Sequence, residues 1–492
     1  MRRLSRPLIV VLLGHVTIDK LSDDVLLHIF DSYRCECECK DEDEDENKYS
    51  AWWWHVLVHI CERWRRIIFA SPHSLNLQLD CKSKSDMEAT LDIWPALPVN
   101  IHAYFYRNYA DEDGIIGALR NRDRIAGINF QGLTCSTFEK CVALMQQSFP
   151  VLSSLRLSVR NPEIAYVTSD AFLGGSAPRL KSVSLTGIRF PALAKLLSSA
   201  RDLVDLDLSH PSTDISLEAM VTCLSVLTRL QSLTVNFGQG TSFFYPTNQS
   251  PNPSTHTVLP ALTKFTSRGP YKHLGDFLNR IHTPLLEDGD LEFDDVPNFD
   301  SPQVSQFIHR TGMFNLPSQF DVYIRKWVLV KLSSSTGPEK QFNISFSGFD
   351  FVLYTEVHLM EQICTRYPPL LSHIERLELN GADVKYRYLY PLNAPWLEFL
   401  QPFTAVKILH LSESAMMLGV SRTLRELSEE EATGVLPALH TLLLERDRED
   451  ASEAARLVEP FIATRKHSEH PVVLKLYSGS DLDPSNGSGD TE

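Results

Sequence analysis

Two segments near the start of the chain repeat apolar residues at the spacing of an amphipathic helix. In residues 21–33 the apolar positions are Leu21, Val25, Leu26, Ile29, Phe30 and Tyr33. In residues 57–68 they are Leu57, Ile60, Cys61, Trp64, Ile67 and Ile68. Residues three and four apart share one face of a helix, so each segment predicts a helix with one apolar face. Neither helix can bury that face alone, and the pair therefore favours a docking surface over a catalytic site.

From about Pro150 onward the chain repeats the pattern Leu-x-x-Leu-x-Leu or a close variant. Copies occur at 152–157, 180–185, 203–208, 230–235, 374–379, 406–411 and 439–444, with a shorter version at 262–265. Leu157 to Leu185 is 28 residues, Leu185 to Leu208 is 23 and Leu208 to Val235 is 27. These periods lie in, and slightly beyond, the range of leucine-rich repeats.

Helix-like stretches at 190–200, 217–227 and 274–281 lie between the repeated strands. A strand followed by a helix, iterated, predicts parallel strands on one side and helices on the other, in a curved solenoid. Residues 285–370 fit this pattern poorly. We expect strands at 291–293 and 328–330 and a helix at 359–367, and a separate α/β subdomain remains an alternative there.

Side chains alternate across a strand, so the residues between the repeated leucines should point away from the helices. These positions form the candidate target-binding face, and they are Arg156, Ser184, Asp207, Thr234, Glu378, His410 and Leu443. The alternative is that they are merely solvated surface positions.

Composition narrows the class of protein. A hydrophobic content of 43% and a charged content of 22% are typical of a soluble globular chain. The net charge of −15 argues against a nonspecific nucleic-acid binder, because no basic face is available to neutralise phosphates. Nine cysteines, an odd number, favour free thiols in the cytoplasm or nucleus. The apolar run 7–13 resembles a secretory signal, but no cleavage site follows and it is too short to span a bilayer, so we expect no membrane association.

No convincing reactive centre is visible in the sequence. Cys35, Cys37 and Cys39 would share one side of an extended chain and could bind a soft metal, but no further ligand completes the set. The acidic run 41–46 beside them favours an incidental polar loop. Gly174–Pro178 lacks the spacing of a nucleophile turn, and the pair His467 and His470 is too generic for a metal site. We therefore expect no catalytic residue, no metal and no cofactor.

The two N-terminal segments resemble the F-box, whose pattern is Leu-Pro-x-Glu/Asp-x-Leu-x-x-Ile-Phe followed by Val-Cys-x-x-Trp. By this resemblance, the residues that hold the module together or face its adaptor are Leu21, Asp24, Val25, Leu26, Ile29, Phe30, Ile60, Cys61 and Trp64. Ser22 replaces the usual Pro, and an insertion at 34–50 separates the two halves. Segments 69–79, 91–98, 172–180 and 219–227 resemble the large fungal set of F-box proteins with leucine-rich C-terminal regions. The alternative is two core helices of another helical domain.

The predicted fold class is α+β, with a small N-terminal helical F-box module followed by an irregular α/β leucine-rich-repeat solenoid. The expected divisions are an apolar segment 1–17, an F-box 18–75, a linking segment 76–133, a leucine-rich recognition domain 134–477 and a disordered acidic tail 478–492.

The resemblance implies a non-enzymatic substrate-recognition adaptor of a Skp, cullin and F-box ubiquitin ligase. The F-box would bind the Skp-type adaptor, and the leucine-rich region would bind a protein target. Two alternatives remain. One is an F-box scaffold in a complex that does not ubiquitinate, and the other is a hydrolase or transferase within residues 285–370.

Overall fold

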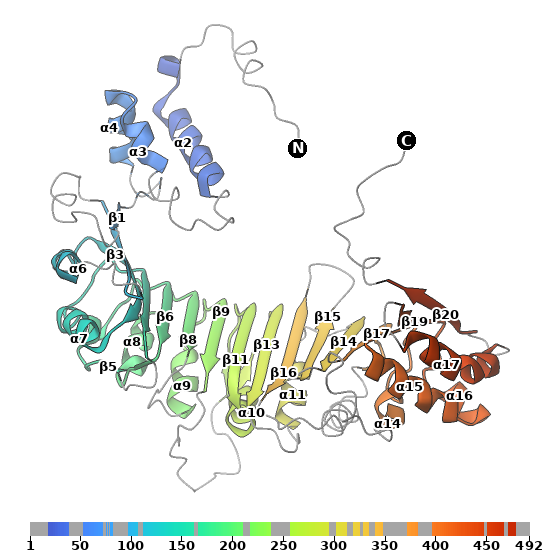
Figure 1. Cartoon of the computed structure of the whole chain (residues 1–492). Coiled ribbons are helices and arrows are strands. Elements are labelled where there is room, and N and C mark those ends of the chain that lie inside the picture. The colour runs from blue at the N-terminus through green and yellow to red at the C-terminus, as the bar shows by residue number, and fades with distance from the viewer. Residues whose placement is uncertain are drawn as a thin grey trace. The chain divides into compact units, whose positions relative to one another are not determined.

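The protein has a mixed α/β fold with a large, mostly parallel β-sheet (Figure 1). The computed structural model describes residues 18–38, 53–71, 75, 77, 79–81, 97–106, 112–161, 166–209, 217–237, 256–294, 302–311, 318–324, 328–333, 340–347, 371–381, 396–446, 450–466 and 471–478. The chain divides into two compact units. Unit 1 is Met1–Asn161 with Ser169–Leu180, and unit 2 is Pro162–Thr168 with Lys181–Glu492.

Unit 1 begins with a short 3-10 helix, η1 (Ile18–Lys20), and three α-helices, α2 (Asp23–Glu38), α3 (Trp53–Val58) and α4 (Glu62–Ala70). Helix α2 packs against both α3 and α4. The sequence predicted one continuous helix over 57–68, and this prediction is wrong. Cys61 has an extended backbone and its Sγ accepts a hydrogen bond from the Trp64 amide, so it caps the start of α4 and does not lie within a helix.

The sheet of unit 1 has four parallel strands in chain order. They are β1 (Leu79–Cys81), β2 (Val99–Tyr104), β3 (Ile125–Leu133) and β4 (Ser154–Val159). Helices α6 (Glu112–Leu119) and α7 (Cys135–Leu144) and the 3-10 helix η2 (Phe172–Gly175) complete the described part of the unit. Segment 76–133, expected as a link, thus contributes β1 to β3 and α6, and the sheet begins before Thr134.

Unit 2 continues the alternation of strand and helix. Its strands are β5 (Tyr166–Val167), β6 (Ser182–Thr186), β7 (Ile188–Arg189), β8 (Asp205–Ser209), β9 (Ser232–Asn236), β10 (Thr257–Val258), β11 (Lys264–Pro270), β12 (Ile281–His282), β13 (Asp288–Asp294), β14 (Gln319–Ile324), β15 (Val328–Ser333), β16 (Gln341–Ser347), β17 (Arg376–Asn380), β18 (Ile408–Ser412), β19 (Thr441–Glu445) and β20 (Val473–Tyr477). Its helices are α8 (Leu193–Ser199), α9 (Leu217–Leu224), α10 (Tyr271–Arg280), α11 (Pro302–Arg310), α14 (Trp396–Leu400), α15 (Ser414–Glu426), α16 (Glu429–Gly434) and α17 (Ala451–Arg465). These helices lie along one face of the strands (Figure 1).

Each copy of the leucine pattern forms a strand, as predicted. The first apolar residue of each copy precedes the strand, and the next two lie within it on the buried face. In β6, for example, Leu180, Val183 and Leu185 are all buried. Burying one such side chain contributes roughly 1.5–3 kcal/mol, so the repeated row holds the strands against the helices. The predicted helices at 190–200, 217–227 and 274–281 are found as α8, α9 and α10.

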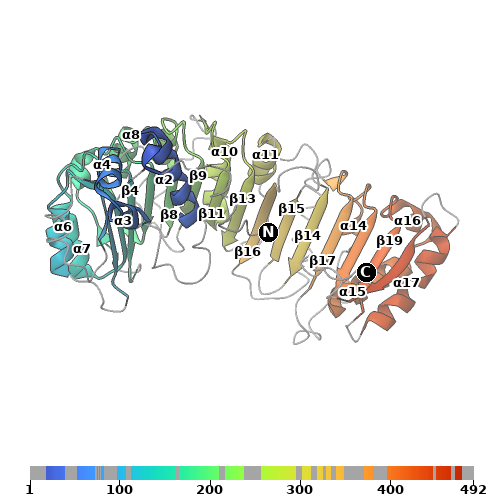
Figure 2. The ribbon, with the colours of Figure 1, turned by 90° about the horizontal axis from the view of Figure 1, so that it is seen from above.

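The irregular stretch differs from the rest in strand order. The order in the sheet is β13-β16-β15-β14-β17, with β15 antiparallel to both of its neighbours (Figure 2). The strands predicted at 291–293 and 328–330 are found within β13 and β15, whereas the helix predicted at 359–367 lies outside the described residues. Because β16 pairs with β13 and β14 pairs with β17, these strands belong to the main sheet of unit 2.

Candidate docking surface and polar sheet face

Polar contacts hold the three N-terminal helices in place. The Ser22 Oγ accepts a hydrogen bond from the Val25 amide at 3.4 Å and so caps the start of α2. The Arg63 guanidinium donates to Asp23 Oδ1 at 2.7 Å and to the Leu21 carbonyl at 2.6 Å, so it ties α4 to the start of α2. Arg65 donates from Nε to the Val58 carbonyl at 3.0 Å, which joins α4 to the end of α3.

The apolar side chains of these helices separate into a core and an exposed set. The core consists of buried residues from all three helices, namely Leu26, Phe30, Trp54, Leu57, Val58, Ile67 and Ile68. The rings of Phe30 and Trp64 meet edge to face with centroids 4.9 Å apart, and those of Trp54 and Phe69 with centroids 5.9 Å apart. The helices thus form a packed module with its own interior.

Five apolar side chains of these helices, or next to them in sequence, are exposed. Val25 and Ile29 are each 42% exposed and Tyr33 is 38% exposed, and these residues lie four apart along α2. Val56 within α3 is 60% exposed, and Ile60, just after the end of α3, is 54% exposed. Exposed apolar side chains of this kind are candidates for contact with a partner. We call these five residues the docking surface.

The structure therefore assigns distinct places to the residues that the F-box pattern selected. Leu26 and Phe30 belong to the core, and Trp64 contacts it from a half-buried position. Val25, Ile29 and Ile60 are on the docking surface, Asp24 is exposed, Leu21 is half-buried, and Cys61 is the exposed cap of α4. Sequence reasoning missed Val56, because α3 is too short to show a helical repeat.

The candidate target-binding residues lie on the sheet face away from the leucines. Arg156 is exposed on β4 in unit 1. In unit 2, Cα partners place Ser184, Asp207 and Thr234 in one row, and Glu378, His410 and Leu443 in another. Ser184 and His410 are buried and offer almost no contact area. Target binding by these positions stays a prediction.

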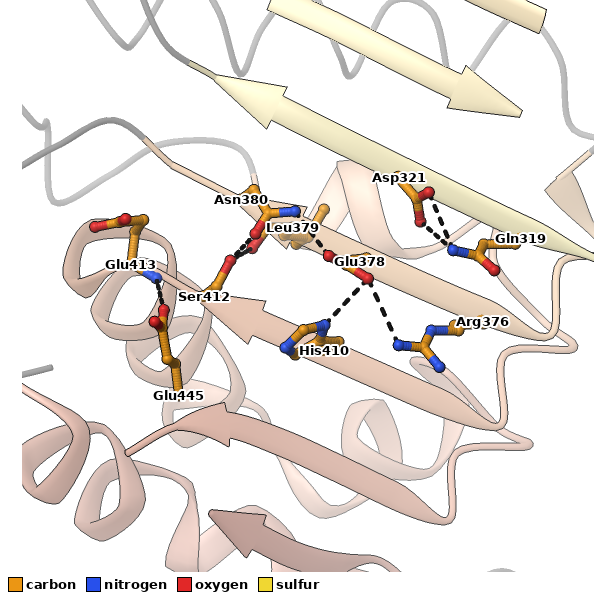
Figure 3. A network of polar contacts seen from close by, with 10 residues as sticks. All are labelled: Gln319, Asp321, Arg376, Glu378, Leu379, Asn380, His410, Ser412, Glu413 and Glu445. Atoms are coloured by element: carbon orange, nitrogen blue, oxygen red, sulfur yellow. Dashed lines mark hydrogen bonds and ion pairs between the residues drawn. The ribbon is translucent and has the colours of Figure 1, made fainter. Parts of the chain in front are cut away.

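A network of polar contacts surrounds Glu378 on this face (Figure 3). Its carboxylate lies 3.2 Å from His410 Nδ1 and 3.6 Å from Arg376, and it accepts a hydrogen bond from Asn380 at 2.9 Å. Burial by itself raises the pKa of Glu378, but the close contact of His410, the hydrogen bond from Asn380 and the charges of His410 and Arg376 outweigh it and lower the pKa to about 2. Glu378 therefore stays ionised throughout the physiological range. Sequence reasoning missed Arg376 and Asn380, which lie two positions either side of Glu378.

Asp321 lies beside Glu378 in the same row, but nearby groups compensate the negative charge of its carboxylate poorly. Its carboxylate accepts two hydrogen bonds from Gln319, each 3.0 Å long, but burial and the charge of Glu378 raise its pKa from 3.8 to about 6. Because the folded protein holds this proton more tightly than the unfolded chain, the stability of unit 2 should fall as the pH rises from 4 to 6.

Asp321→Asn should stabilise the protein at pH 7.5 by about 1–3 kcal/mol and leave its stability at pH 4 nearly unchanged, since the wild-type carboxyl is already protonated there. Urea unfolding at the two pH values measures both effects. The matched control is Asp294→Asn. Asp294 is also buried but pairs with Arg268 at 3.3 Å, so its replacement should lower the stability at pH 7.5. Equal effects of Asp321→Asn at both pH values would contradict the assignment.

The possible metal-binding residues Cys35, Cys37, Cys39, His467 and His470 gain no support from the structure. The backbone of Cys35 and Cys37 is helical, because α2 continues to Glu38, so the extended arrangement assumed for a metal site is wrong for these two residues. Cys39, His467 and His470 lie outside the described residues. Within the described ranges, no group of three or more His, Cys, Asp or Glu side chains is arranged to hold a metal ion. Among the same residues, every helix is too short or too polar to cross a membrane.

No family model matches the chain, and no curated protein matches it significantly.

Proposed function

We propose that the protein is a substrate-recognition adaptor of a Skp, cullin and F-box ubiquitin ligase. In this proposal the helical module is an F-box that binds a Skp-type adaptor through the docking surface. The strand and helix ladder is a leucine-rich-repeat solenoid that binds a protein target with its polar sheet face. The chain itself carries out no bond chemistry.

The separation of core and surface in the helical module is the observation that carries the proposal. Residues of the F-box pattern fall into both classes, since Phe30 is buried while Ile29, its neighbour in the pattern, is 42% exposed. An isolated helical domain would gain stability by burying Ile29, Val56 and Ile60. Their exposure fits a module whose apolar residues are shared between its own interior and a partner subunit.

The mechanism is proximity. A target held on the sheet face stays close to the ubiquitin-transferring enzyme carried by the assembled ligase, which raises the effective concentration of the reacting groups. This chain contributes orientation, and its affinity for the target sets which protein is modified.

Co-purification tests the proposal against the scaffold alternative. The full chain, expressed with a Skp-type adaptor and a cullin, should recover both subunits in one complex on size-exclusion chromatography. Recovery of the adaptor without the cullin would favour a scaffold that does not ubiquitinate. Failure to recover the adaptor at all would overturn the F-box assignment.

A further inference from the structure

Three neighbouring strands in the sheet of unit 1 carry no carboxylate. The described strands β2, β3 and β4 contain no Asp or Glu, although the chain has a net charge of −15. By contrast, β13 alone carries four acidic residues. We call the polar face of strands β2 to β4, together with Tyr106 just after β2, the tyrosine–arginine face. It includes Asn100, His102, Tyr104, Tyr106, Asn129, Gln131, Arg156 and Ser158.

Two tyrosines supply most of the exposed aromatic area of this face. Tyr104 is 41% exposed at the end of β2, and Tyr106, two residues further on, is 53% exposed. Tyrosine presents a large contact area with few rotatable bonds and a hydroxyl that can donate or accept a hydrogen bond. Exposed tyrosines beside an arginine have the composition of a binding hot spot.

The ring of Tyr106 is held in position before any ligand binds. The Tyr106 ring lies directly on Gly132, which has a φ of +71°. A Cβ atom at this position would stand only 2.8 Å from the ring, so the close contact requires glycine. The Tyr106 hydroxyl is 3.3 Å from the Ser158 Oγ. The Arg160 guanidinium donates to the Phe105 carbonyl and so steadies the backbone beside Tyr106. A preorganised ring of this kind loses little conformational freedom on binding.

Arg156 supplies a positive charge on the β4 side of the face. It is exposed on β4 opposite Asn129 of β3, and among the described residues it makes no hydrogen bond or ion pair. A guanidinium offers five N–H donors in a planar arrangement that matches a carboxylate. With the tyrosine hydroxyls and the Asn129 and Gln131 amides nearby, the face is rich in donors and lacks a carboxylate of its own.

We propose that the tyrosine–arginine face binds an acidic, extended segment of the target protein, with one Asp or Glu paired to Arg156 and the adjoining residues laid on Tyr104 and Tyr106. The inference rests on the proposed function and adds the chemical class of the target. A nucleic acid is the less favoured anion, since a single exposed arginine on this face neutralises few phosphates.

Fluorescence anisotropy on the full chain tests this inference. The probe is a labelled octapeptide of alternating glutamate and valine, and its control has glutamine in place of glutamate. The wild-type chain should bind the glutamate peptide at least about tenfold more tightly than the control, and Arg156→Gln should remove most of this difference. Tyr106→Ala should weaken both peptides. The matched control Lys195→Gln removes an exposed positive charge from α8 and should change neither affinity.

Equal affinity for the two peptides, or wild-type binding by Arg156→Gln, would overturn the inference. So would tighter binding of a single-stranded octanucleotide than of the glutamate peptide. The test is independent of the F-box assignment, because peptide binding needs no adaptor. Arg156→Gln should still co-purify with the Skp-type adaptor, and loss of adaptor binding by docking-surface variants should leave peptide binding intact.

Discussion

Ile29→Asp should lower the affinity of the chain for a Skp-type adaptor by about 100-fold or more while leaving the module folded. A carboxylate at the centre of an apolar interface loses its water without gaining a partner, and a penalty of about 3 kcal/mol corresponds to that factor. The side chain of Ile29 is 42% exposed in the free chain, so its replacement should change the free energy of unfolding by no more than about 0.5 kcal/mol. Isothermal titration calorimetry and thermal melting measure the two quantities.

Two further variants make this prediction specific. His28→Asp places the same charge on an exposed position of α2 beside the row of Val25, Ile29 and Tyr33, and it should leave adaptor binding nearly unchanged. Phe30→Ala should act differently, because Phe30 is a core residue and its truncation should cost about 3–5 kcal/mol of stability. Undiminished binding by Ile29→Asp would show that the docking surface faces something else.

Arg465→Met should cost unit 2 about 3–5 kcal/mol of stability, the loss typical of breaking a buried charged network. Arg465 is only 1% exposed at the end of α17. Its guanidinium donates to five backbone carbonyls between the end of α16 and the start of β19, those of Ala432, Val435, Leu436, Pro437 and Leu439. Methionine fills a similar volume but leaves all five carbonyls without this donor.

The measurement is urea unfolding combined with amide hydrogen exchange. Exchange should accelerate first around residues 432–439, where the carbonyls lose their donor. Arg465→Lys should lie between wild type and Arg465→Met, because an ammonium keeps the charge but has only three donors. Arg456→Met on the exposed side of the same helix is the control and should have almost no effect. A loss below about 1 kcal/mol for Arg465→Met would mean that water replaces the guanidinium.

The leucine pattern predicted most strands because each copy carries its own burial signal. Leu377 and Leu379 of β17, or Leu409 and Leu411 of β18, are buried wherever the strand stands in the sheet. The order of β14, β15 and β16 could not be predicted in this way. Whether a strand pairs with the strand before it depends on residues far away in sequence. The alternation of buried and half-buried side chains along β15 is the same whether the strand runs parallel or antiparallel to its neighbours.

For the candidate site, the sequence identified the apolar residues of the helices but not their roles. Helical spacing groups Val25, Leu26, Ile29 and Phe30 together, because they lie within about one third of the helix circumference. Only the packing of α3 and α4 on one edge of that stripe separates the core pair from the exposed pair. The network around Glu378 could not be predicted from the sequence either, because the pKa of Glu378 depends on His410 in the next strand.

The reversed strand order restricts where this chain can vary in length. Three residues separate β14 from β15 and seven separate β15 from β16. Strands β14 and β16 run in the same direction, so joining them without β15 would require a crossover of roughly a dozen residues or more. A strand and helix pair elsewhere in unit 2 can be lost or duplicated while its neighbours still pair. We therefore expect the β14–β16 segment to be kept or lost as one unit.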